Sequence, residues 1–529
     1  MDLHTAGLRR GVVAAPHAAA VEAGGAILAE GGNAIEAMVA MAAVIAVVYP
    51  HMNQIGGDGF WLIREPSGRV RALMAAGVAG SRARPELYAE AGCETIPARG
   101  PLAALTVPGA IAGWSLALEA AQARGGRLPL AELLTAAIRQ AREGFAISRG
   151  HAACAALGGL HRAPGFVETF LVDGKPPAAG TKLQQPALAA TLEQLAHTGL
   201  DDFYRGDVGR EIADDLARIG SPVTRPDLVS CRAAVAEPLS LDLAAGTAYN
   251  TPPPTQGLAS LMILGLFDRL GVRQAESFDH IHGLVEATKR ALTLRDRYLT
   301  DPQRLPHPPN RYLEPAFLDA QAQAIDRQRA SRWPRAGAGG DTIWMGSADA
   351  SGLVVSYIQS LYWEFGSGCV LPKTGVLMQN RGVSFSLDRG ALNRLEPGRL
   401  PVHTLNPALA VLNDGRIMAY GTMGGDAQPQ IQAALFTRHV GFRVPLDAAL
   451  ERPRWMLGQT WGTPHASLMV ESRIDEGVVA RLRAAGHDVE VLAEPYADQM
   501  GHAGAVLLHS DGTLGGAHDP RADGGAAGL

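Results

Sequence analysis

The pattern of apolar and polar positions divides the chain into a helix-rich first part and a strand-rich last part. Near the N-terminus, residues 17–28 and 33–48 have helical character, and Gly31 and Gly32 end the first of these helices. Asn33 is a suitable N-cap for the second helix. Further helices are predicted over 110–123, 130–144, 186–197, 256–270 and 279–299, and a short strand over 60–63.

The texture of the chain changes between about residues 301 and 340, where Pro, Arg, Gln, Ala and Gly follow one another without apolar periodicity. This stretch is typical of a linker. Strand-like runs then follow over 342–348, 352–360, 370–379 and 408–412, with turns such as Asn413-Asp414-Gly415 between them. Helices followed by strands predict an α+β protein whose layers share one core.

Composition narrows the class of protein and its partners. The 529 residues are 47% hydrophobic and 19% charged with a net charge of -5, which is typical of a globular chain with a large core. This mildly acidic balance gives no reason to expect nucleic acid or an anionic membrane as a partner. The most apolar stretch, 34–48, includes Glu36 and is shorter than the roughly 18 residues of a membrane span. Residues 1–15 hold no signal-peptide pattern, so a soluble cytoplasmic protein is expected.

Several kinds of catalytic site lack their sequence motifs. The four cysteines are widely spaced without a CxxC pair, which is typical of buried thiols in a reducing compartment. There is no HExxH, no GxSxG, no P-loop and no GxGxxG after a strand, and the sixteen histidines show no metal-ligand spacing. We therefore expect neither a metal nor a cofactor.

One junction in the chain has a specific chemical interpretation. The linker-like stretch ends in Asp341, and Thr342 opens a strand-like run. If the bond between them breaks, Thr342 gains an α-amine with a pKa of about 7.7–8.0. That amine can act as general base for the hydroxyl of the same residue, and the hydroxyl itself can make the cut. Threonine also favours strands, so this segment alone leaves a purely structural role open.

Motifs spread along the whole chain resemble the γ-glutamyltranspeptidase family of N-terminal-nucleophile hydrolases. Residues 31–37, Gly-Gly-Asn-Ala-Ile-Glu-Ala, are similar to its GGNAxDA, and residues 55–60, Ile-Gly-Gly-Asp-Gly-Phe, are similar to its IGGGGF. Further matches, in the family's order, are Pro108-Gly109, Phe203-Tyr204-Arg205-Gly206, Pro252-Pro253-Pro254 and Asp519-Pro520-Arg521. The resemblance implies a four-layer αββα sandwich with extra N-terminal helices.

The resemblance also implies a set of catalytic residues. Thr342 falls on the family's nucleophile, and Ser360 falls where the family has a second threonine that is hydrogen-bonded to it. Gly424 and Gly425 match the pair whose N–H groups form the oxyanion hole. Cleavage before Thr342 would give residues 1–341 and 342–529, which stay associated around one shared core, as one heterodimer or as a dimer of heterodimers.

The sequence departs from the family where the substrate binds. Ala76 to Gly80 replaces the segment that carries the family's carboxylate-binding arginine, and Tyr362 and Ser384 replace an asparagine and an aspartate. His403-Thr404 replaces a pair of serines. Because charge-assisted hydrogen bonds contribute about 1.5–3 kcal/mol each, an ordinary γ-glutamyl group should bind poorly. Arg381 is then a candidate for a relocated anion-binding residue, although a structural role is an equal alternative.

Three interpretations of function follow. His403 to Pro407 and Gln379 to Gly382 are similar to the oxamate amidohydrolase branch, which implies cleavage of a small carboxylate-bearing amide with release of ammonia. The second interpretation is a γ-glutamyl hydrolase or transpeptidase that acts on glutathione, or an acylase. The third is a catalytically inert scaffold, against which the retained Thr342 and Gly424-Gly425 argue.

Overall fold

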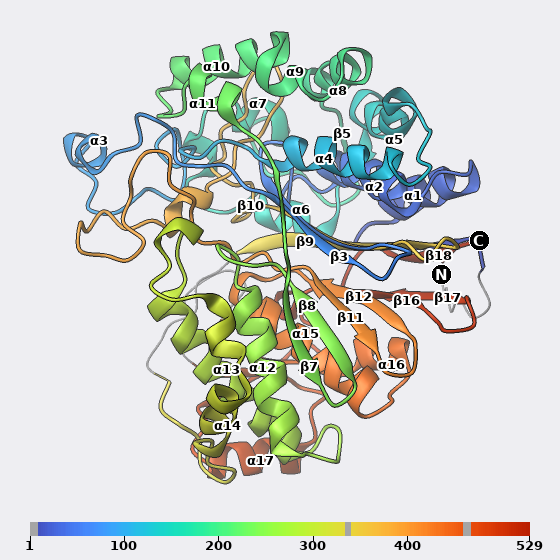
Figure 1. Cartoon of the computed structure of the whole chain (residues 1–529). Helices are drawn as coiled ribbons and strands as arrows, with labels where there is room; N and C mark the ends of the chain where they lie inside the picture. The colour runs from blue at the N-terminus through green and yellow to red at the C-terminus, as the bar shows by residue number, and fades with distance from the viewer. Residues whose placement is uncertain (1–8, 334–339, 459–466) are drawn as a thin grey trace.

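Two antiparallel sheets pack face to face at the centre of the molecule (Figure 1). The structure is a computed structural model that describes residues 9–333, 340–458 and 467–529. The first sheet runs in the order β18 (Gly525–Gly528), β1 (Gly11–Ala15), β9 (Asp341–Asp349), β10 (Val354–Tyr362), β2 (Asp58–Arg64), β3 (Val70–Ala75) and β6 (Ala234–Ala236). The second runs β17 (Leu514–His518), β16 (Ala503–Leu508), β12 (Ile417–Thr422), β11 (Ala408–Leu412), β8 (Gly246–Asn250) and β7 (Leu239–Leu243).

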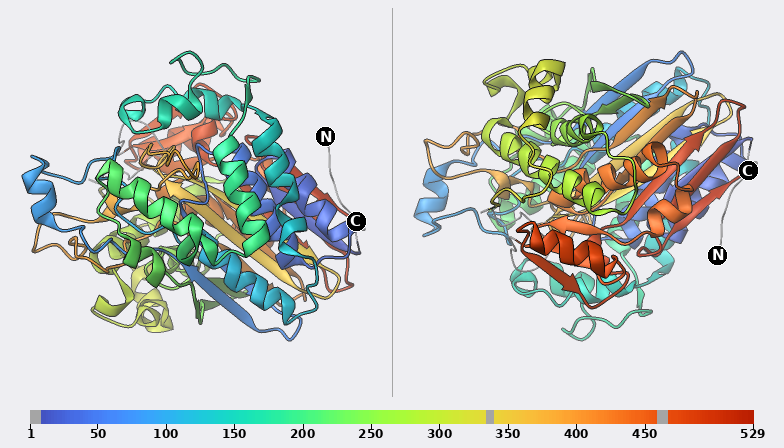
Figure 2. Two further views of the ribbon diagram at one scale, coloured as in Figure 1. Left: turned by 90° about the horizontal axis from the view of Figure 1, so that it is seen from above. Right: turned by 90° about the horizontal axis from the view of Figure 1, so that it is seen from below.

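A helical layer covers the outer face of each sheet, as the views from above and below show (Figure 2). The first layer consists mainly of α1 (Ala18–Ala29), α2 (Ala34–Val48), α4 (Ala110–Gln122), α5 (Leu130–Glu143) and α8 (Pro186–Thr198). The second consists mainly of α12 (Gly257–Leu270), α13 (Phe278–Tyr298) and α15 (Gln428–Phe436). The expected α+β fold, a four-layer αββα sandwich, is therefore confirmed.

Smaller elements surround these layers. Helices on the side of the first sheet are α3 (Pro85–Glu90), α6 (Arg149–Cys154), α7 (Phe166–Phe170), α9 (Asp202–Arg205), α10 (Asp207–Ile219) and α11 (Arg225–Ser230). On the other side lie α14 (Pro315–Gln323), α16 (Leu446–Glu451) and α17 (Glu476–Ala484). The short strands β13 (Trp455–Leu457), β14 (Leu468–Glu471) and β15 (Val489–Leu492) form a third sheet, and β4 (Phe145–Ala146) pairs with β5 (Lys182–Leu183).

The interface between the two main sheets is filled by apolar side chains from both. Trp344 of β9 packs there with Val12, Leu62, Leu409 and Val506. Its indole Nε1 donates to Ser356 Oγ at 2.9 Å, which satisfies the buried donor. A Cβ built on Gly421 would lie 2.1 Å from the Trp344 ring, so only glycine leaves room for the indole at that point.

Helix α2 shows why a fully apolar segment can be a helix in this fold. All of its residues are buried, because it lies between the first sheet and the outer helices α1, α4 and α5. The predicted N-cap is confirmed: Asn33 Oδ1 accepts from the N–H groups of Ile35 and Glu36, and Glu36 Oε2 accepts from Asn33 N at 2.8 Å. Glu36 Oε1 accepts from Leu128 N, so this buried carboxylate is fully hydrogen-bonded.

Two predictions of local structure were wrong. Residues 370–379 form no strand; Pro372 lacks an N–H group and Gly375 has a positive φ of 67°, so the chain turns back on itself, with Leu371 N donating to Val376 O. The 301–340 stretch is not simply a linker, because Tyr312, Leu313 and Leu318 pack onto the α12 core and α14 forms there. The glycine-rich part of that stretch, 337–339, lies outside the described residues. No helix in the described ranges is both long and apolar enough to cross a membrane.

The parts of the chain before and after Thr342 interleave in both sheets. In the first sheet β9 and β10 lie between β1 and β2, and in the second β11 pairs with β8. Each sheet therefore depends on hydrogen bonds between the two parts. A break in the backbone before Thr342 would leave these ladders intact.

Candidate active site

Thr342 and Ser360 lie side by side on neighbouring strands, on the face of the first sheet that meets the second sheet. Because side chains alternate along a strand, Thr342 shares the inner face with Trp344. The Thr342 hydroxyl donates to Ser360 Oγ at 3.2 Å, and each residue is 2% exposed. Ser360 is paired in register with Asp58 of β2, so Thr342, Ser360 and Asp58 form a row across three strands. Strand β9 begins at Asp341, one residue before Thr342.

A bulge in β10 shapes the strand beside this row. The register between β9 and β10 shifts between Gln359 and Tyr362, and Tyr362 then pairs with Asp341. Tyr362 has a φ of +87°, which is a rare conformation for a bulky residue. Its N–H donates to Ser360 Oγ at 2.7 Å, so the bulge helps to fix the serine hydroxyl that contacts Thr342. Bulges and strained residues are frequent next to active sites.

Gly424 and Gly425 form a tight turn between β12 and α15, next to the start of β9. Both have positive φ angles, 115° and 53°, and the turn continues into α15 through Asp426. A Cβ built on Gly340 would lie 3.2 Å from Gly425 Cα, so the residue before Asp341 passes close to this turn. Gln256 Nε2 donates to Gly425 O at 2.7 Å, and Arg295 forms an ion pair with Asp426 at 2.6 Å. These buried contacts hold the glycine turn in place.

Gln428, which the sequence analysis did not single out, also reaches the nucleophile candidate. Its Nε2 donates to Thr342 Oγ1 at 3.4 Å, and its Oε1 accepts from Asn406 N at 3.2 Å. Its position three residues after Gly425, at the first turn of α15, is the signal that would have found it. Together with Ser360, Gln428 places a second polar group at the Thr342 hydroxyl.

Arg381 is buried against the ring of Tyr362, whereas Ser360 contacts the backbone N–H of the same tyrosine. Its guanidinium carbon is 3.2 Å from the centre of the Tyr362 ring, and Nη1 donates to Thr404 Oγ1 at 3.2 Å. Its Nε has no hydrogen-bond partner among the described residues. Of the residues predicted for substrate binding, Arg381, Tyr362 and Thr404 are therefore in direct contact. Ser384 ends the same short helical turn, and its buried Oγ has no hydrogen-bond partner within the described ranges.

Asp58 and His403 form a second polar contact beside this group. The two are 0% exposed, and His403 Nε2 lies 3.4 Å from Asp58 Oδ2. Asp58 Oδ1 accepts from the N–H groups of Gly77 and Gly109, whereas Oδ2 and both ring nitrogens of His403 have no hydrogen-bond partner in the part of the chain that the structure describes. Burial raises the pKa of Asp58 to about 7, although neighbouring amide groups and Arg381 lower it. Burial lowers the pKa of His403, and Arg381 lowers it further, so its imidazole is neutral.

The sequence model of the protein family described as gamma-glutamyltranspeptidase matches residues 20–529 of this chain. The chain belongs to the gamma-glutamyltranspeptidase family. It is 53% identical over 522 residues to the oxamate amidohydrolase proenzyme of Klebsiella pneumoniae subsp. pneumoniae, with 98% of each chain covered. It is 37% identical to the glutathione hydrolase-like YwrD proenzyme of Bacillus subtilis, again over 98% of each chain. The crystal structure of cephalosporin acylase from Bacillus halodurans superimposes with a TM-score of 0.89 at 30% identity, covering 100% of this chain and 97% of that one.

Family membership agrees with the fold and the class of reaction. The protein is an enzyme that acts on amides, and its sandwich is that of the N-terminal-nucleophile hydrolases. Asp58, the third residue of the row with Thr342 and Ser360, stands where the family motif Ile-Gly-Gly-Gly-Gly-Phe has a glycine. That departure adds a buried carboxyl group 3.4 Å from His403.

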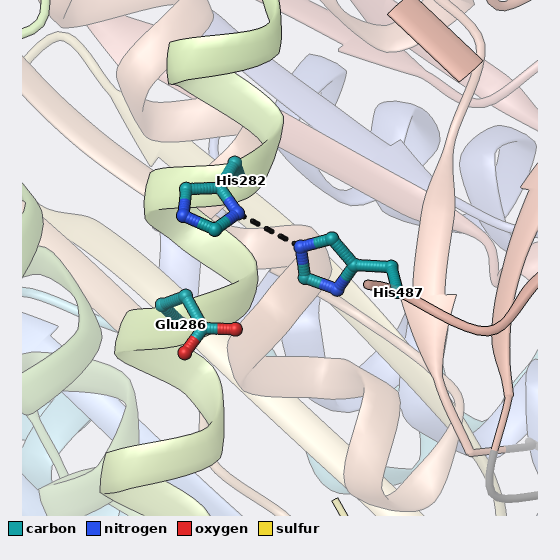
Figure 3. Close-up of side chains that lie close together, drawn as sticks. All are labelled: His282, Glu286 and His487. Atoms are coloured by element: carbon teal, nitrogen blue, oxygen red, sulfur yellow. Dashed lines mark hydrogen bonds between the residues drawn. The ribbon is translucent and has the colours of Figure 1, made fainter. Parts of the chain in front are cut away.

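A separate polar cluster lies between α13 and the loop after α17: Figure 3 shows His282 and Glu286 on the helix, with His282 hydrogen-bonded to His487. His282, Glu286 and His487 have ligand atoms within 4.8 Å of one another. Their contacts hold neighbouring segments together. His282 contacts His487 and the Asp326 carbonyl, each at 2.8 Å. Glu286 accepts a hydrogen bond from Ser331 N at 3.1 Å and forms an ion pair with Lys289 at 2.7 Å. The Lys289 ammonium beside the carboxylate also opposes a second cation there. The cluster fixes residues 326–331 against α13.

Replacing Ser360 should slow catalysis without abolishing it. Ser360→Ala removes the hydroxyl that accepts from both Thr342 and Tyr362 N, while Gln428 still reaches Thr342. A lost hydrogen bond with an unsatisfied buried donor costs about 1–3 kcal/mol, so we expect kcat to fall by about 10–100-fold. Steady-state kinetics measures this. Ser360→Thr, which keeps the hydroxyl, is the matched control and should retain most of the activity; equal losses in both variants would contradict the assigned contact.

Replacing Asp58 should change stability in a pH-dependent way. The pKa of Asp58 is raised from 3.8 to about 7, so between these values the unfolded chain ionises first and the free energy of unfolding falls as pH rises. Below pH 3.8 Asp58 is protonated in both states and does not lower the free energy of unfolding. Above pH 7 it is ionised in both states, and the loss of free energy is constant. Asp58→Asn keeps the acceptor for Gly77 and Gly109 and should be more stable than wild type by up to about 4 kcal/mol above pH 7. Melting temperatures from pH 4 to 8 test this; a difference that does not grow with pH would contradict it.

Proposed function

We propose that the protein cleaves itself before Thr342 and then uses Thr342 to hydrolyse the amide of a small carboxylate such as oxamate, with release of ammonia. The observation that carries this proposal is the buried Thr342 hydroxyl, hydrogen-bonded to Ser360 and Gln428 next to the Gly424-Gly425 turn. The relative at 53% identity is named an oxamate amidohydrolase proenzyme, which supports both processing and substrate.

Self-cleavage begins when the Thr342 hydroxyl oxygen bonds to the carbonyl carbon of Asp341. The carbon–nitrogen bond between the two residues then breaks, the nitrogen takes up a proton, and an ester remains on Thr342. Water hydrolyses this ester, leaving a carboxylate on Asp341 and a free amine on Thr342. Since both sheets interleave strands from either side of the break, the fragments 1–341 and 342–529 stay associated.

Substrate hydrolysis repeats the same chemistry on an external amide. The Thr342 amine, with a pKa of about 7.7–8.0 for an unperturbed α-amine, takes the hydroxyl proton as the oxygen attacks the substrate carbonyl. The N–H groups of Gly424 and Gly425 stabilise the oxyanion, and preorganised donors of this kind contribute about 2.7–4 kcal/mol each. Ammonia leaves with a proton from the Thr342 amine, and water then hydrolyses the acyl ester on Thr342.

Arg381 is the residue proposed to bind the substrate carboxylate. Its buried guanidinium has an unused Nε donor, and Tyr362 connects it to the catalytic row, because the Tyr362 N–H contacts Ser360 and its ring contacts Arg381. Thr404, His403 and Ser384 line the same region as further substrate-binding candidates. A bidentate arginine suits a carboxylate better than any other side chain.

The decisive experiment combines mass and turnover. Intact mass of purified protein should show two chains, residues 1–341 and 342–529, and the processed protein should release ammonia from oxamate. The alternative substrates are γ-glutamyl amides, as the glutathione hydrolase-like relative suggests, or the larger acyl groups of acylases. Turnover of a γ-glutamyl anilide without ammonia release from oxamate would overturn the proposed substrate, and a single full-length chain in an active preparation would overturn the proposed nucleophile.

A further inference from the structure

Two buried side chains of opposite charge lie in the region that is proposed to receive the substrate. Arg381 is 2% exposed and Asp58 is 0% exposed. Arg381 Nη1 donates to Thr404 Oγ1 at 3.2 Å, and the preceding residue, His403, lies 3.4 Å from Asp58 Oδ2, so the two charged groups flank the same loop. Arg381 also lowers the pKa of Asp58. Among the described residues, Asp58 Oδ2 and Arg381 Nε have no hydrogen-bond partner. Buried charged groups with unused hydrogen-bonding atoms can bind a polar ligand through those atoms.

The other titratable groups that face Asp58 carry no charge near neutral pH. His403 is neutral because burial and Arg381 lower its pKa. Burial raises the pKa of Tyr204, Tyr357 and Cys231, each of which also interacts with Asp58. Asp426, the other acid that acts on Arg381, is itself paired with Arg295 at 2.6 Å. Within the described part of the chain, Asp58 is therefore the acid whose charge is available to balance Arg381.

We propose that Asp58 is the internal counter-ion of Arg381 in the empty site, and that it takes up one proton when an anionic acyl group binds to the guanidinium. This rests on the proposed role of Arg381 in binding the substrate carboxylate. An ionised Asp58 next to a second anion is unfavourable in a buried site, since like charges a few ångströms apart repel by several kcal/mol at an effective dielectric constant near 20. A protonated Asp58 removes that repulsion.

The consequence concerns substrate class. Amides whose acyl group carries one negative charge are favoured while Asp58 is protonated, and they lose this advantage as Asp58 ionises. Uncharged amides of the same shape should be indifferent to Asp58. The aspartate is therefore a specificity-determining residue. The neutral imidazole of His403, 3.4 Å away, is positioned to accept a hydrogen bond from the protonated carboxyl of Asp58.

Oxamate and oxamide make a matched pair of probes, because they have nearly the same shape and differ in charge. For the processed wild-type enzyme we expect KM for oxamate to rise by about tenfold or more between pH 6.5 and 9, while KM for oxamide stays nearly constant. In Asp58→Asn both values should be flat with pH. Titration of the Thr342 amine affects both substrates alike, so the ratio of their KM values isolates Asp58. If Asp58→Asn does not fold, Asp58→Gly supplies the residue of the resembling motif.

Calorimetry with oxalate, the product of oxamate hydrolysis, counts the proton directly. Titrations at pH 8 in two buffers of different ionisation enthalpy should show uptake of about one proton per oxalate by wild type and none by Asp58→Asn. Equal proton uptake in the two proteins, or a pH-dependent oxamate KM that persists in Asp58→Asn, would overturn the proposal. If neither amide is turned over, only the proposed function is overturned, because the oxalate titration still decides the role of Asp58. If oxalate does not bind at pH 6.5 or at pH 8, the counter-ion proposal is overturned.

Discussion

Thr342→Ala should leave the protein as one uncleaved chain of 529 residues without amidase activity. The substitution removes the hydroxyl that is proposed to cut the Asp341–Thr342 bond and, because the bond stays intact, no α-amine forms. Loss of a nucleophile that acts with its own base costs activity by about 10⁴-fold or more. The fold should persist, since the strand ladders of β9 remain and the substitution removes the side-chain hydrogen bonds of one hydroxyl, including those with Ser360 and Gln428. Denaturing electrophoresis and ammonia release measure the two effects.

Thr342→Ser is the matched variant for this prediction. Serine keeps the hydroxyl and can form the amine, so slow cleavage and partial activity are expected. The missing methyl group leaves the side chain less restricted in rotation, which lowers the fraction of time spent in the attacking geometry. A Thr342→Ala protein that still separates into two fragments would show that another residue makes the cut.

Arg381→Met should remove most of the preference for an anionic amide. The buried guanidinium packs on the ring of Tyr362, whose N–H contacts Ser360, and charge-assisted hydrogen bonds contribute about 1.5–3 kcal/mol each. We therefore expect kcat/KM for oxamate to fall by about 10–150-fold, mainly through KM, while kcat/KM for oxamide changes little. Methionine fills much of the same volume, so packing against Tyr362 is largely retained.

The neighbouring aspartate makes this variant easier to interpret. When Arg381 is removed, the pKa of Asp58 should rise further, because Arg381 is one of the groups that lower it. Asp58 then stays protonated at neutral pH, and no unpaired charge remains buried. Arg381→Lys keeps the charge without the planar fork and should lie between wild type and Arg381→Met. Equal losses for oxamate and oxamide would indicate that Arg381 supports the structure and does not bind the carboxylate.

The site depends on a strained strand end. Tyr362 takes a positive φ where β10 bulges, and this turns its N–H toward Ser360 and its ring against Arg381. One residue thus connects the catalytic row to the anion-binding group. The sheet ladders on both sides, from β9 and β2, hold the bulge in a conformation that an isolated tyrosine would avoid.

Much of the framework was available from the sequence. Local patterns located α1, α2, α5, α8, α12 and α13, since apolar periodicity and capping residues act within a few turns of helix. Strand-like runs located β9, β10 and β11. The strand predicted over 370–379 is absent, because the apolar residues there are buried in an irregular turn. Apolar content alone does not distinguish a buried turn from a buried strand. Helix α14, which packs on α12, was missed because it is only nine residues long and buries only Leu318 and Ala322, too few positions for a recognisable pattern.

The sequence by itself determined the family and, through its motifs, the candidates Thr342, Ser360, Gly424 and Gly425, since these depend on residue identity and order along the chain. Only the tertiary structure decided which distant residues share the site. Gln428 reaches Thr342 across 86 positions in the sequence. Asp58, at the start of β2, meets His403 in the segment before β11, because strand register and the packing of the two sheets bring these residues together. The raised pKa of Asp58 is likewise a tertiary property, because its burial beside His403 arises from the folded arrangement and has no counterpart in the local sequence.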